Sequence, residues 1–521
     1  MKKPSANTKS IGMNEAADLF HVSSSTIHNW VKEGFLSLNE EHRVTMESVH
    51  QFQSQHAGKH KLQARANKLL KDEHDVVEVG RIIQKELSAN AFDDAIGNRY
   101  EAMLSESYKN KEGITYTPKA IVDDMMRDVQ VDDSTLFLDP CCGSGNFLVK
   151  AIEMGVAPDH VYGFDTDPNA VAIACRRIKE MTGHETSNVV CADFLKKCQR
   201  LNKKFDLVFT NPPWGKKLPR KERCAYAKRY QAGSSPDTCS LFLFASLSVL
   251  KSDGIMGLLM PESFFKIASY EDARKAVLQQ TILRIKDYGK AFKNMYSAVS
   301  IVAKQVGCDE NHEISCAYQD LEYTRLQRSF LSMPRFNLNY WTKAEEMQVV
   351  EQLMQHPHLT LKGQAAWGLG IVTGNNAKIC KRGRRVGYKP VYRGKDILPS
   401  RLKGAKLYIN PKDFPRCQQM SPMTMYQAPE KLVYRFISNE LVFYCDTHQR
   451  YILNSANMLV LNEDFPLTSK RLAAIMSSPL TNWLFKQLFN THKILKSDLE
   501  LLPIFTDSSL HRRFNLLHLG R

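Results

Sequence analysis

Short apolar segments alternate with segments of helical pattern between residues 113 and 330. Alternation of this kind is typical of a doubly wound, mainly parallel sheet, in which helices carry the chain from one strand to the next. We therefore expect an α/β fold in this part of the chain. The candidate strands are Thr135–Leu138, Val161–Phe164, Asn188–Cys191, Leu207–Thr210, Ile255–Met260, Ile282–Asp287 and Ser300–Ala303.

Positive charge is concentrated in the last third of the chain. Residues 331–521 hold 27 Lys and Arg against 13 Asp and Glu, whereas the first 330 residues hold 44 against 42. A basic region joined to a nearly neutral one commonly binds a polyanion, and nucleic acid is the usual one. The alternative is a solvated basic surface without a partner.

No segment of the sequence predicts a membrane or metal partner. The longest apolar run, Leu241–Leu250, is about half as long as a membrane span, and MKKPSANTKS leads into no apolar signal segment. The 12 cysteines include no CxxC pair, so we expect reduced thiols and no metal site. These features predict a cytoplasmic protein.

The N-terminal part predicts three short helices, Asn14–Phe20, Ser25–Glu33 and Met46–Gln55. The string EAADLFHVSSSTIHNWVKEGFL resembles the winged helix-turn-helix of excisionase-like and MerR-like regulators, which implies that its second helix enters the major groove. Lys32 is the only cation of that helix, so a small protein-interaction module is the alternative. The residues expected to face DNA are Ser24, Ser25, Thr26, His28 and Asn29.

A glycine-rich turn follows the first candidate strand, in the string DPCCGSGNF. Glycines after a strand let the backbone approach a ligand closely. Asp165, 22 residues past Gly143 in YGFDTDP, suits a carboxylate that binds the two hydroxyls of a ribose. The turn lacks both the GxGxxG pattern of dinucleotide enzymes and the Lys-Ser/Thr pair that binds a triphosphate.

DPCCGSGNF resembles the first motif, DPxxGSGxF, of S-adenosylmethionine-dependent DNA amino-methyltransferases. GITYTPKAIVDDMM resembles the segment that closes over the carboxylate and amine of the cofactor, and CADFL resembles the pair that binds its adenine. The resemblance implies a Rossmann-like methyltransferase sheet and these cofactor-binding residues: Thr115, Thr117, Asp139, Gly143, Gly145, Phe147, Asp165, Asp193 and Phe194. For Asp193, a helix cap is the alternative. Cys141 follows a proline, as the nucleophile of cytosine C5 enzymes does, but it lies inside the cofactor loop.

A second motif, Asn211-Pro212-Pro213-Trp214, ends the strand KFDLVFT at the carboxyl edge of the sheet, where α/β folds place their sites. An exocyclic amine of adenine is a poor nucleophile because it is conjugated with the ring. Acceptors on Asn211 and on the Pro212 carbonyl would draw its electron density out of the ring plane, and the prolines would hold both acceptors in place. Trp214 offers a face for a flipped base. The segment IKDYGKAFKNMYSAVSIV resembles the one that supplies a second stacking aromatic, here Phe292, for which core packing is the alternative.

The order of motifs resembles the gamma arrangement of amino-methyltransferases, in which the C-terminal region reads the target. PVYRGKDILPSRL, PEKLVYRF and HKILKSDLELLPI look like boxes of restriction-modification specificity domains. The predicted phosphate-binding cluster is Lys381, Arg382, Arg384 and Arg385. The predicted domains are a helix-turn-helix at 10–56, a helical connector at 57–112, a methyltransferase domain at 113–330 and an α+β target recognition domain at 331–521.

The resemblance implies an enzyme that methylates adenine N6 in duplex DNA with S-adenosylmethionine, in a restriction-modification or phage-defence system, with any endonuclease on a separate chain. Asn at position 211 favours adenine, since cytosine-N4 enzymes more often carry Ser there. The alternatives are cytosine-N4 methylation, methylation of RNA or of a protein glutamine, and a regulator built on a methyltransferase scaffold.

Overall fold

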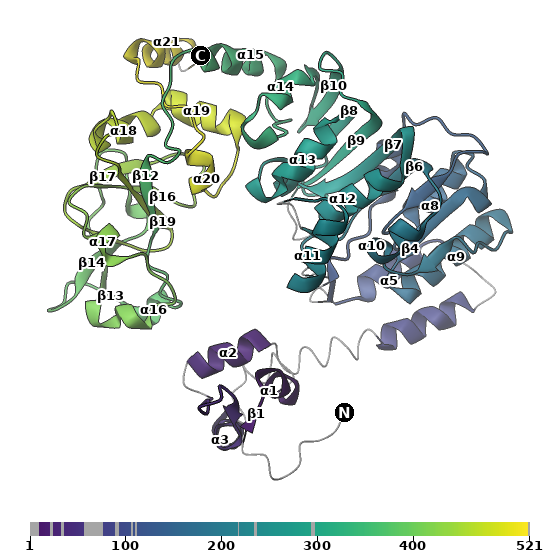
Figure 1. The fold of residues 1–521 in the computed structure, drawn as a ribbon, viewed down its shortest axis with the longest axis horizontal. Helices are drawn as coiled ribbons and strands as arrows, with labels where there is room; N and C mark the ends of the chain where they lie inside the picture. The colour runs from purple at the N-terminus through teal and green to yellow at the C-terminus, as the bar shows by residue number, and fades with distance from the viewer. Residues whose placement is uncertain are drawn as a thin grey trace. The chain divides into compact units, whose positions relative to one another are not determined.

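The chain forms two compact units, residues 1–219 and 220–521, and each is described by itself (Figure 1). No helix among the described residues is long and apolar enough to cross a membrane. The computed structural model describes residues 10–20, 24–32, 36–56, 77–88, 93–105, 108–109, 112–216, 218–233, 237–292 and 297–518.

The N-terminal part has its own small hydrophobic core. Trp30 packs on Phe52 with ring centroids 4.5 Å apart, and Phe20 meets both rings edge-on at 5.4 Å. The three predicted helices are present, each within two residues of its predicted bounds. The elements are β1 (Ser10–Ile11), α1 (Met13–Leu19), α2 (Ser24–Lys32), β2 (Val44–Thr45) and α3 (Met46–His56).

The sheet of the first unit is parallel, in the order β6-β3-β4-β5. Its central strand β3 is buried along its whole length, as expected for a strand covered on both faces. The α/β prediction is correct here, and four predicted strands are found. The elements are α7 (Lys119–Met126), β3 (Phe137–Asp139), α8 (Asn146–Glu153), β4 (Val161–Asp165), α9 (Pro168–Thr182), β5 (Val189–Cys191), α10 (Phe194–Lys197) and β6 (Phe205–Thr210).

The segment predicted as a connector packs against this α/β layer from residue 77 onward. Residues 77–87 are helical, and with α5 (Ile96–Met103) they form a hydrophobic cluster on α9. The Tyr100 hydroxyl donates a hydrogen bond of 2.6 Å to Asp167, the residue that caps α9. Residues 77–87 and α5 therefore contribute to the core of the first unit.

The second unit begins with five strands in the order β11-β10-β8-β9-β7. β8 and β10 are parallel, whereas β9 is antiparallel to both β7 and β8, so β9 is an exception to the mainly parallel arrangement that was predicted. β9 cannot run parallel to β8 because residues 288–297 are too few for the crossover that a parallel pair needs. The hairpin of β10 and β11 was not predicted. The elements are α11 (Arg220–Arg229), α12 (Thr238–Val249), β7 (Leu250–Pro261), α13 (Glu271–Leu278), β8 (Gln280–Asp287), β9 (Ala298–Gly307), β10 (Glu313–Tyr318), β11 (Leu321–Leu326) and α14 (Arg328–Leu331).

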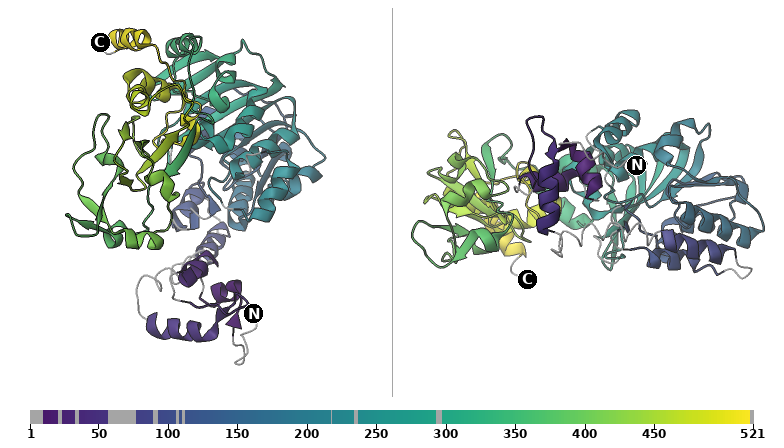
Figure 2. Two further views of the ribbon diagram at one scale, coloured as in Figure 1. Left: turned by 60° about the vertical axis from the view of Figure 1, so that its left-hand side comes forward. Right: turned by 90° about the horizontal axis from the view of Figure 1, so that it is seen from below.

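The remainder of the second unit is α+β, as predicted, and carries two four-stranded sheets with separate cores (Figures 1 and 2). The sheets are β12-β19-β16-β17 and β13-β15-β14-β18. Their strands are β12 (Ala365–Leu369), β13 (Cys380–Arg382), β14 (Lys389–Tyr392), β15 (Leu407–Ile409), β16 (Lys431–Arg435), β17 (Phe443–Asp446), β18 (Tyr451–Ile452) and β19 (Ala456–Leu461). The helices are α15 (Ala344–Met354), α16 (Asn376–Ile379), α17 (Met423–Tyr426), α18 (Ser469–Met476), α19 (Pro479–Leu488), α20 (Lys496–Leu499) and α21 (Ser508–His518).

Side chains of residues 337–342 cap the C-terminal end of α19. Trp341 Nε1 donates to the Lys486 carbonyl at 2.8 Å, and Asn339 Nδ2 donates to the Gln487 carbonyl at 3.0 Å. The last carbonyls of a helix have no partner within the helix. Residues that follow the β10–β11 hairpin therefore hold the α19 end in place.

Candidate active site

The glycine-rich turn between β3 and α8 requires glycine at two positions. Gly143 and Gly145 have φ values of 50° and 87°, in the left-handed region that side chains disfavour. A Cβ on Gly145 would lie 2.9 Å from the Ala174 Cβ, and one on Gly143 would lie 3.0 Å from the Tyr116 ring. The turn therefore brings its backbone close to both α9 and residue 116.

Two carboxylates end the neighbouring strands β3 and β4 beside this turn. Asp139 is buried and accepts a hydrogen bond from the Cys141 amide at 3.0 Å. Burial raises the pKa of Asp139 to about 7. Asp165 accepts from the amides of Gly143 and Asp167, both at 2.9 Å, and burial raises its pKa as well. Asp165 thus fixes the turn to the end of β4.

Asn211 follows β6 and presents an unsatisfied acceptor. Its Nδ2 donates to the Thr115 carbonyl at 2.9 Å, while its Oδ1 is buried and has no hydrogen-bond partner among the described residues. A carbonyl can only accept, so the nitrogen of the amide must face Thr115. The oxygen is therefore held as the free acceptor.

The rest of the Asn-Pro-Pro-Trp loop lies against the backbone of Gly113. A Cβ on Gly113, whose φ is 71°, would lie 2.9 Å from the Trp214 carbonyl and 3.1 Å from the Pro213 Cβ. Lys216 and Glu112 form an ion pair of 2.9 Å next to this contact. Trp214 itself is 8% exposed. The segment before Thr115 and the loop after β6 therefore support each other.

A pocket joins the turn, the segment at 115–117 and Asn211. Six of its lining residues were predicted as site residues. The other five, Tyr116, Cys141, Cys142, Ser144 and Asn146, were not. The Tyr116 hydroxyl is buried without a partner among the described residues, and the one signal for it in the sequence is its position between two predicted threonines. The lining residues are Thr115, Tyr116, Thr117, Asp139, Cys141, Cys142, Gly143, Ser144, Asn146, Phe147 and Asn211.

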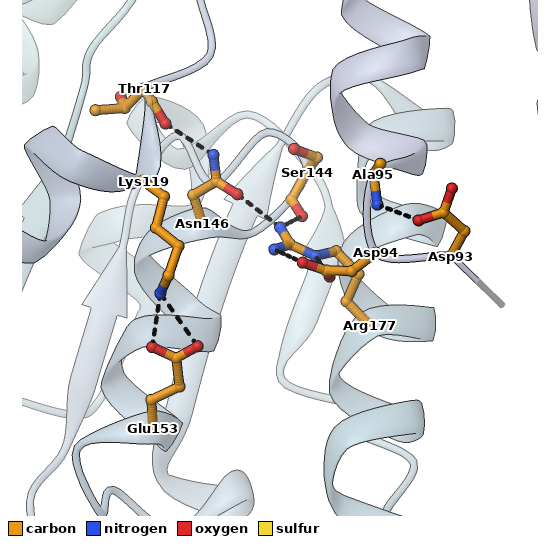
Figure 3. A network of polar contacts seen from close by, with 9 residues as sticks. All are labelled: Asp93, Asp94, Ala95, Thr117, Lys119, Ser144, Asn146, Glu153 and Arg177. Carbon is orange, nitrogen blue, oxygen red and sulfur yellow. Dashed lines mark hydrogen bonds and ion pairs between the residues drawn. The ribbon is translucent and has the colours of Figure 1, made fainter.

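A polar network links the turn to α9 and to the segment at 115–117 (Figure 3). Arg177 on α9 donates to the Ser144 carbonyl at 2.8 Å and to Asn146 Oδ1 at 2.7 Å. Asn146 Nδ2 donates in turn to the Thr117 carbonyl at 2.8 Å. Neither Arg177 nor Asn146 was predicted to matter, because no motif marks a buried arginine on a helix.

Among the predicted residues that do not line this pocket are Asp193, Phe194 and Phe292. The Asp193 carboxylate caps α10 by accepting from the Leu195 amide at 3.0 Å, which is the alternative raised for it. Phe194 is buried with its ring 5.4 Å from that of Phe164. Phe292 is buried in the second unit, between β8 and β9. The roles of these three residues in binding cofactor and base stay predictions.

The predicted phosphate-binding cluster lies on β13 and in the loop that follows it. Lys381 donates to the Lys378 carbonyl at 3.1 Å. The other three, Arg382, Arg384 and Arg385, are exposed, and none has an ion-pair partner within the described part of the chain. Such cations are available to an anion in solution.

The predicted DNA-facing residues of α2 lie partly outside what the structure describes. The side chains of Ser25 and Thr26 lie outside the described residues, whereas His28 is exposed with Nδ1 2.8 Å from the Ser24 carbonyl. In the described ranges, no group of three or more His, Cys, Asp or Glu residues could hold a metal ion.

The chain is similar to known proteins over both of its main parts. Residues 91–301 match the family described as N-6 DNA Methylase, and residues 389–504 match the TaqI-like C-terminal specificity domain. The chain is 41% identical over 394 residues to the Type II methyltransferase M.VspI of Vibrio sp. (strain 343), which covers 75% of this chain and 97% of that protein. It is 26% identical over 188 residues to the modification methylase CviBIII of Paramecium bursaria Chlorella virus NC1A, covering 35% and 47%.

Two solved structures share the fold. The Type IIL restriction-modification enzyme MmeI in complex with DNA has a TM-score of 0.54 at 10% identity, covering 81% of this chain and 72% of that one. The DrdV–DNA complex also has a TM-score of 0.54, at 13% identity, covering 98% and 65%. At these identities the likeness is one of fold.

Proposed function

Because the chain belongs to the DNA methyltransferases of restriction-modification systems, we propose that it methylates the N6 amino group of adenine in duplex DNA. The observation that carries the proposal is the buried Asn211 Oδ1, an acceptor with no partner among the described residues. A buried acceptor left unpaired is costly, and its satisfaction by a ligand N–H recovers that cost. An exocyclic amino group is a ligand that offers such an N–H.

Asn211 and Pro212 would orient the amino group for reaction. Asn211 Oδ1 would accept one N–H of the amine, and the Pro212 carbonyl would accept the other, so that the nitrogen lone pair leaves conjugation with the ring. Thr115 holds the amide in this orientation before the base arrives, which is preorganisation of the kind that lowers a barrier. The nitrogen would become cationic on methylation and would then release its proton to solvent, so no strong base is required.

The pocket residues fit S-adenosylmethionine, which would supply a methyl group on a positively charged sulfur. The buried Asp139 is desolvated, so a cationic amine beside it would be favourable. The left-handed glycines would allow the turn to approach the cofactor, and the Tyr116 hydroxyl has no hydrogen-bond partner among the described residues. We assign the ribose to Asp165 and the adenine to Asp193 and Phe194, from the resemblance of their motifs.

The DNA substrate would be held by residues 331–521 and would present a flipped base. MmeI and DrdV are each named as complexes with DNA, and residues 389–504 match a specificity domain. A base inside a duplex cannot reach a site at the carboxyl end of a β-strand, so the target base must flip out of the DNA stack. Trp214 and Phe292 are the proposed stacking surfaces. An endonuclease partner is expected on a separate chain.

Methyl transfer from labelled S-adenosylmethionine to unmodified duplex DNA tests the reaction, with nucleosides identified by mass spectrometry. We expect N6-methyladenine from the wild type and a loss of at least about 100-fold for Asn211→Ala, since one preorganised polar group commonly contributes that much. Asn311→Ala, which changes an exposed asparagine, should retain activity. Detection of N4-methylcytosine, or transfer to RNA or protein alone, would contradict the adenine proposal.

A further inference from the structure

Arg177 occupies an unusual position for a charged residue. It is 7% exposed, on a helix that packs against the sheet, and every nitrogen of its guanidinium has a partner. Nε and one terminal nitrogen donate to Asp94, at 2.6 and 3.2 Å. The other terminal nitrogen donates to the glycine-rich turn, at the Ser144 carbonyl and Asn146 Oδ1. An arginine suits this place because its planar fork can serve several acceptors at once.

Asn146 extends these contacts to a third segment. Its oxygen faces Arg177, which can only donate, so its nitrogen must point the other way, toward the Thr117 carbonyl at 2.8 Å (Figure 3). Thr117 lies in the segment whose residue 115 also orients Asn211. One chain of hydrogen bonds therefore joins α9, the turn and the segment at 115–117.

The segment that contains Asp94 and α5 is also packed closely against the glycine-rich turn. A Cβ on Gly97 of α5 would lie 2.7 Å from Ser144 Oγ, so α5 packs directly against the turn. Asp94 immediately precedes α5, and its carboxylate is 69% exposed. The Lys119–Glu153 ion pair drawn in the same view is largely exposed, and such pairs contribute little.

We propose that Arg177 is a positioning residue for the cofactor, which sets the shape of the pocket without lining it. The inference rests on the proposed cofactor. Arg177 is absent from the pocket wall, whereas Ser144, Asn146 and Thr117 belong to it. Loss of the guanidinium would leave the Ser144 carbonyl and Asn146 Oδ1 without their donor, and both would be free to reorient. Cofactor affinity should therefore fall more than the rate of the bound complex.

Calorimetry with full-length protein tests this, using S-adenosylmethionine and S-adenosylhomocysteine as ligands. We expect Arg177→Met to raise Kd for both ligands at least about tenfold, because hydrogen bonds to charged groups are stronger than ordinary ones. Arg177→Lys should give a smaller increase, since an ammonium keeps the charge but not the fork. Lys179→Met, which removes an exposed charge from the same helix, should bind as the wild type does. The rate at saturating cofactor should change less than KM.

A second variant separates positioning from general destabilisation. Asn146→Ala should raise Kd for the cofactor. The double variant Asn146→Ala, Arg177→Met should raise Kd by less than the product of the two single fold-changes, because both side chains act through one network. Unchanged Kd in Arg177→Met, or fully additive effects, would overturn the inference. If Arg177→Met melts too low to measure, the Lys variant and Asn146→Ala decide the matter. Failure of the wild type to bind either ligand would instead contradict the proposed cofactor.

Discussion

At the residue scale, the burial of Asp139 in the pocket reduces the stability of the folded protein. Its pKa is about 7 in the folded protein because burial penalises the charged form. The unfolded chain titrates this carboxyl near its ordinary value, about 3.9. Between those two pH values the folded protein holds a proton that the unfolded one lacks, so the stability contributed by this group falls as pH rises through that window.

We therefore predict that Asp139→Asn is more resistant to urea than the wild type at pH 8, and that the difference shrinks at pH 5. The same variant should bind S-adenosylmethionine more weakly, since the proposed attraction for its amine is lost. Denaturation midpoints at the two pH values measure the first effect, and calorimetry measures the second. Asp133→Asn, at an exposed carboxylate, is the control. A pH-independent difference between Asp139→Asn and the wild type would contradict the burial argument.

At the element scale, the sequence predicted the strands that bear the motifs. It did not predict the direction of every strand or the polar contacts that support the motifs. The turn after β3 and the loop after β6 follow segments whose apolar pattern marks them as buried strands, so their place at the carboxyl edge follows from the sequence. The antiparallel direction of β9 was missed because the composition of an apolar strand does not indicate its direction; the short connection from β8 is the feature of the sequence that requires it. Arg177 and Asn146 were missed because no pattern in the sequence brings together their partners, which are the Asp94 carboxylate, two backbone carbonyls and one another.

The basic cluster on β13 and the loop that follows it leads to a specific prediction about DNA binding. Replacing Arg382, Arg384 and Arg385 by Ser should weaken binding to duplex DNA and reduce the slope of log Kd against log salt by up to about 3, because each phosphate contact contributes about 0.9. Cofactor affinity should not change. Arg512→Ser with Arg513→Ser, on the exposed face of α21, serves as the control. If both variants lost the same affinity for DNA per charge removed, net charge alone would determine binding, and the position of the cluster would not.

At the scale of the whole molecule, charge is divided unequally between the two ends of the chain. Residues 331–521 hold 27 Lys and Arg against 13 Asp and Glu, whereas residues 10–56 hold 2 against 6. A module with this acidic balance repels phosphates, so it adds little to general affinity for DNA. Its proposed contacts through Ser25, Thr26 and His28 would have to be made with base edges.

Deletion of residues 10–56 distinguishes these contributions. We predict that the shortened protein methylates DNA as the wild type does and binds arbitrary duplex DNA equally well or slightly more tightly, measured by anisotropy over a range of salt. If the module reads operator DNA, the wild type should protect DNA upstream of its gene in footprinting, and the shortened protein should not. Unchanged protection would exclude that role, and a large loss of affinity for arbitrary DNA would contradict the charge argument, because the basic residues at 331–521 would then not suffice.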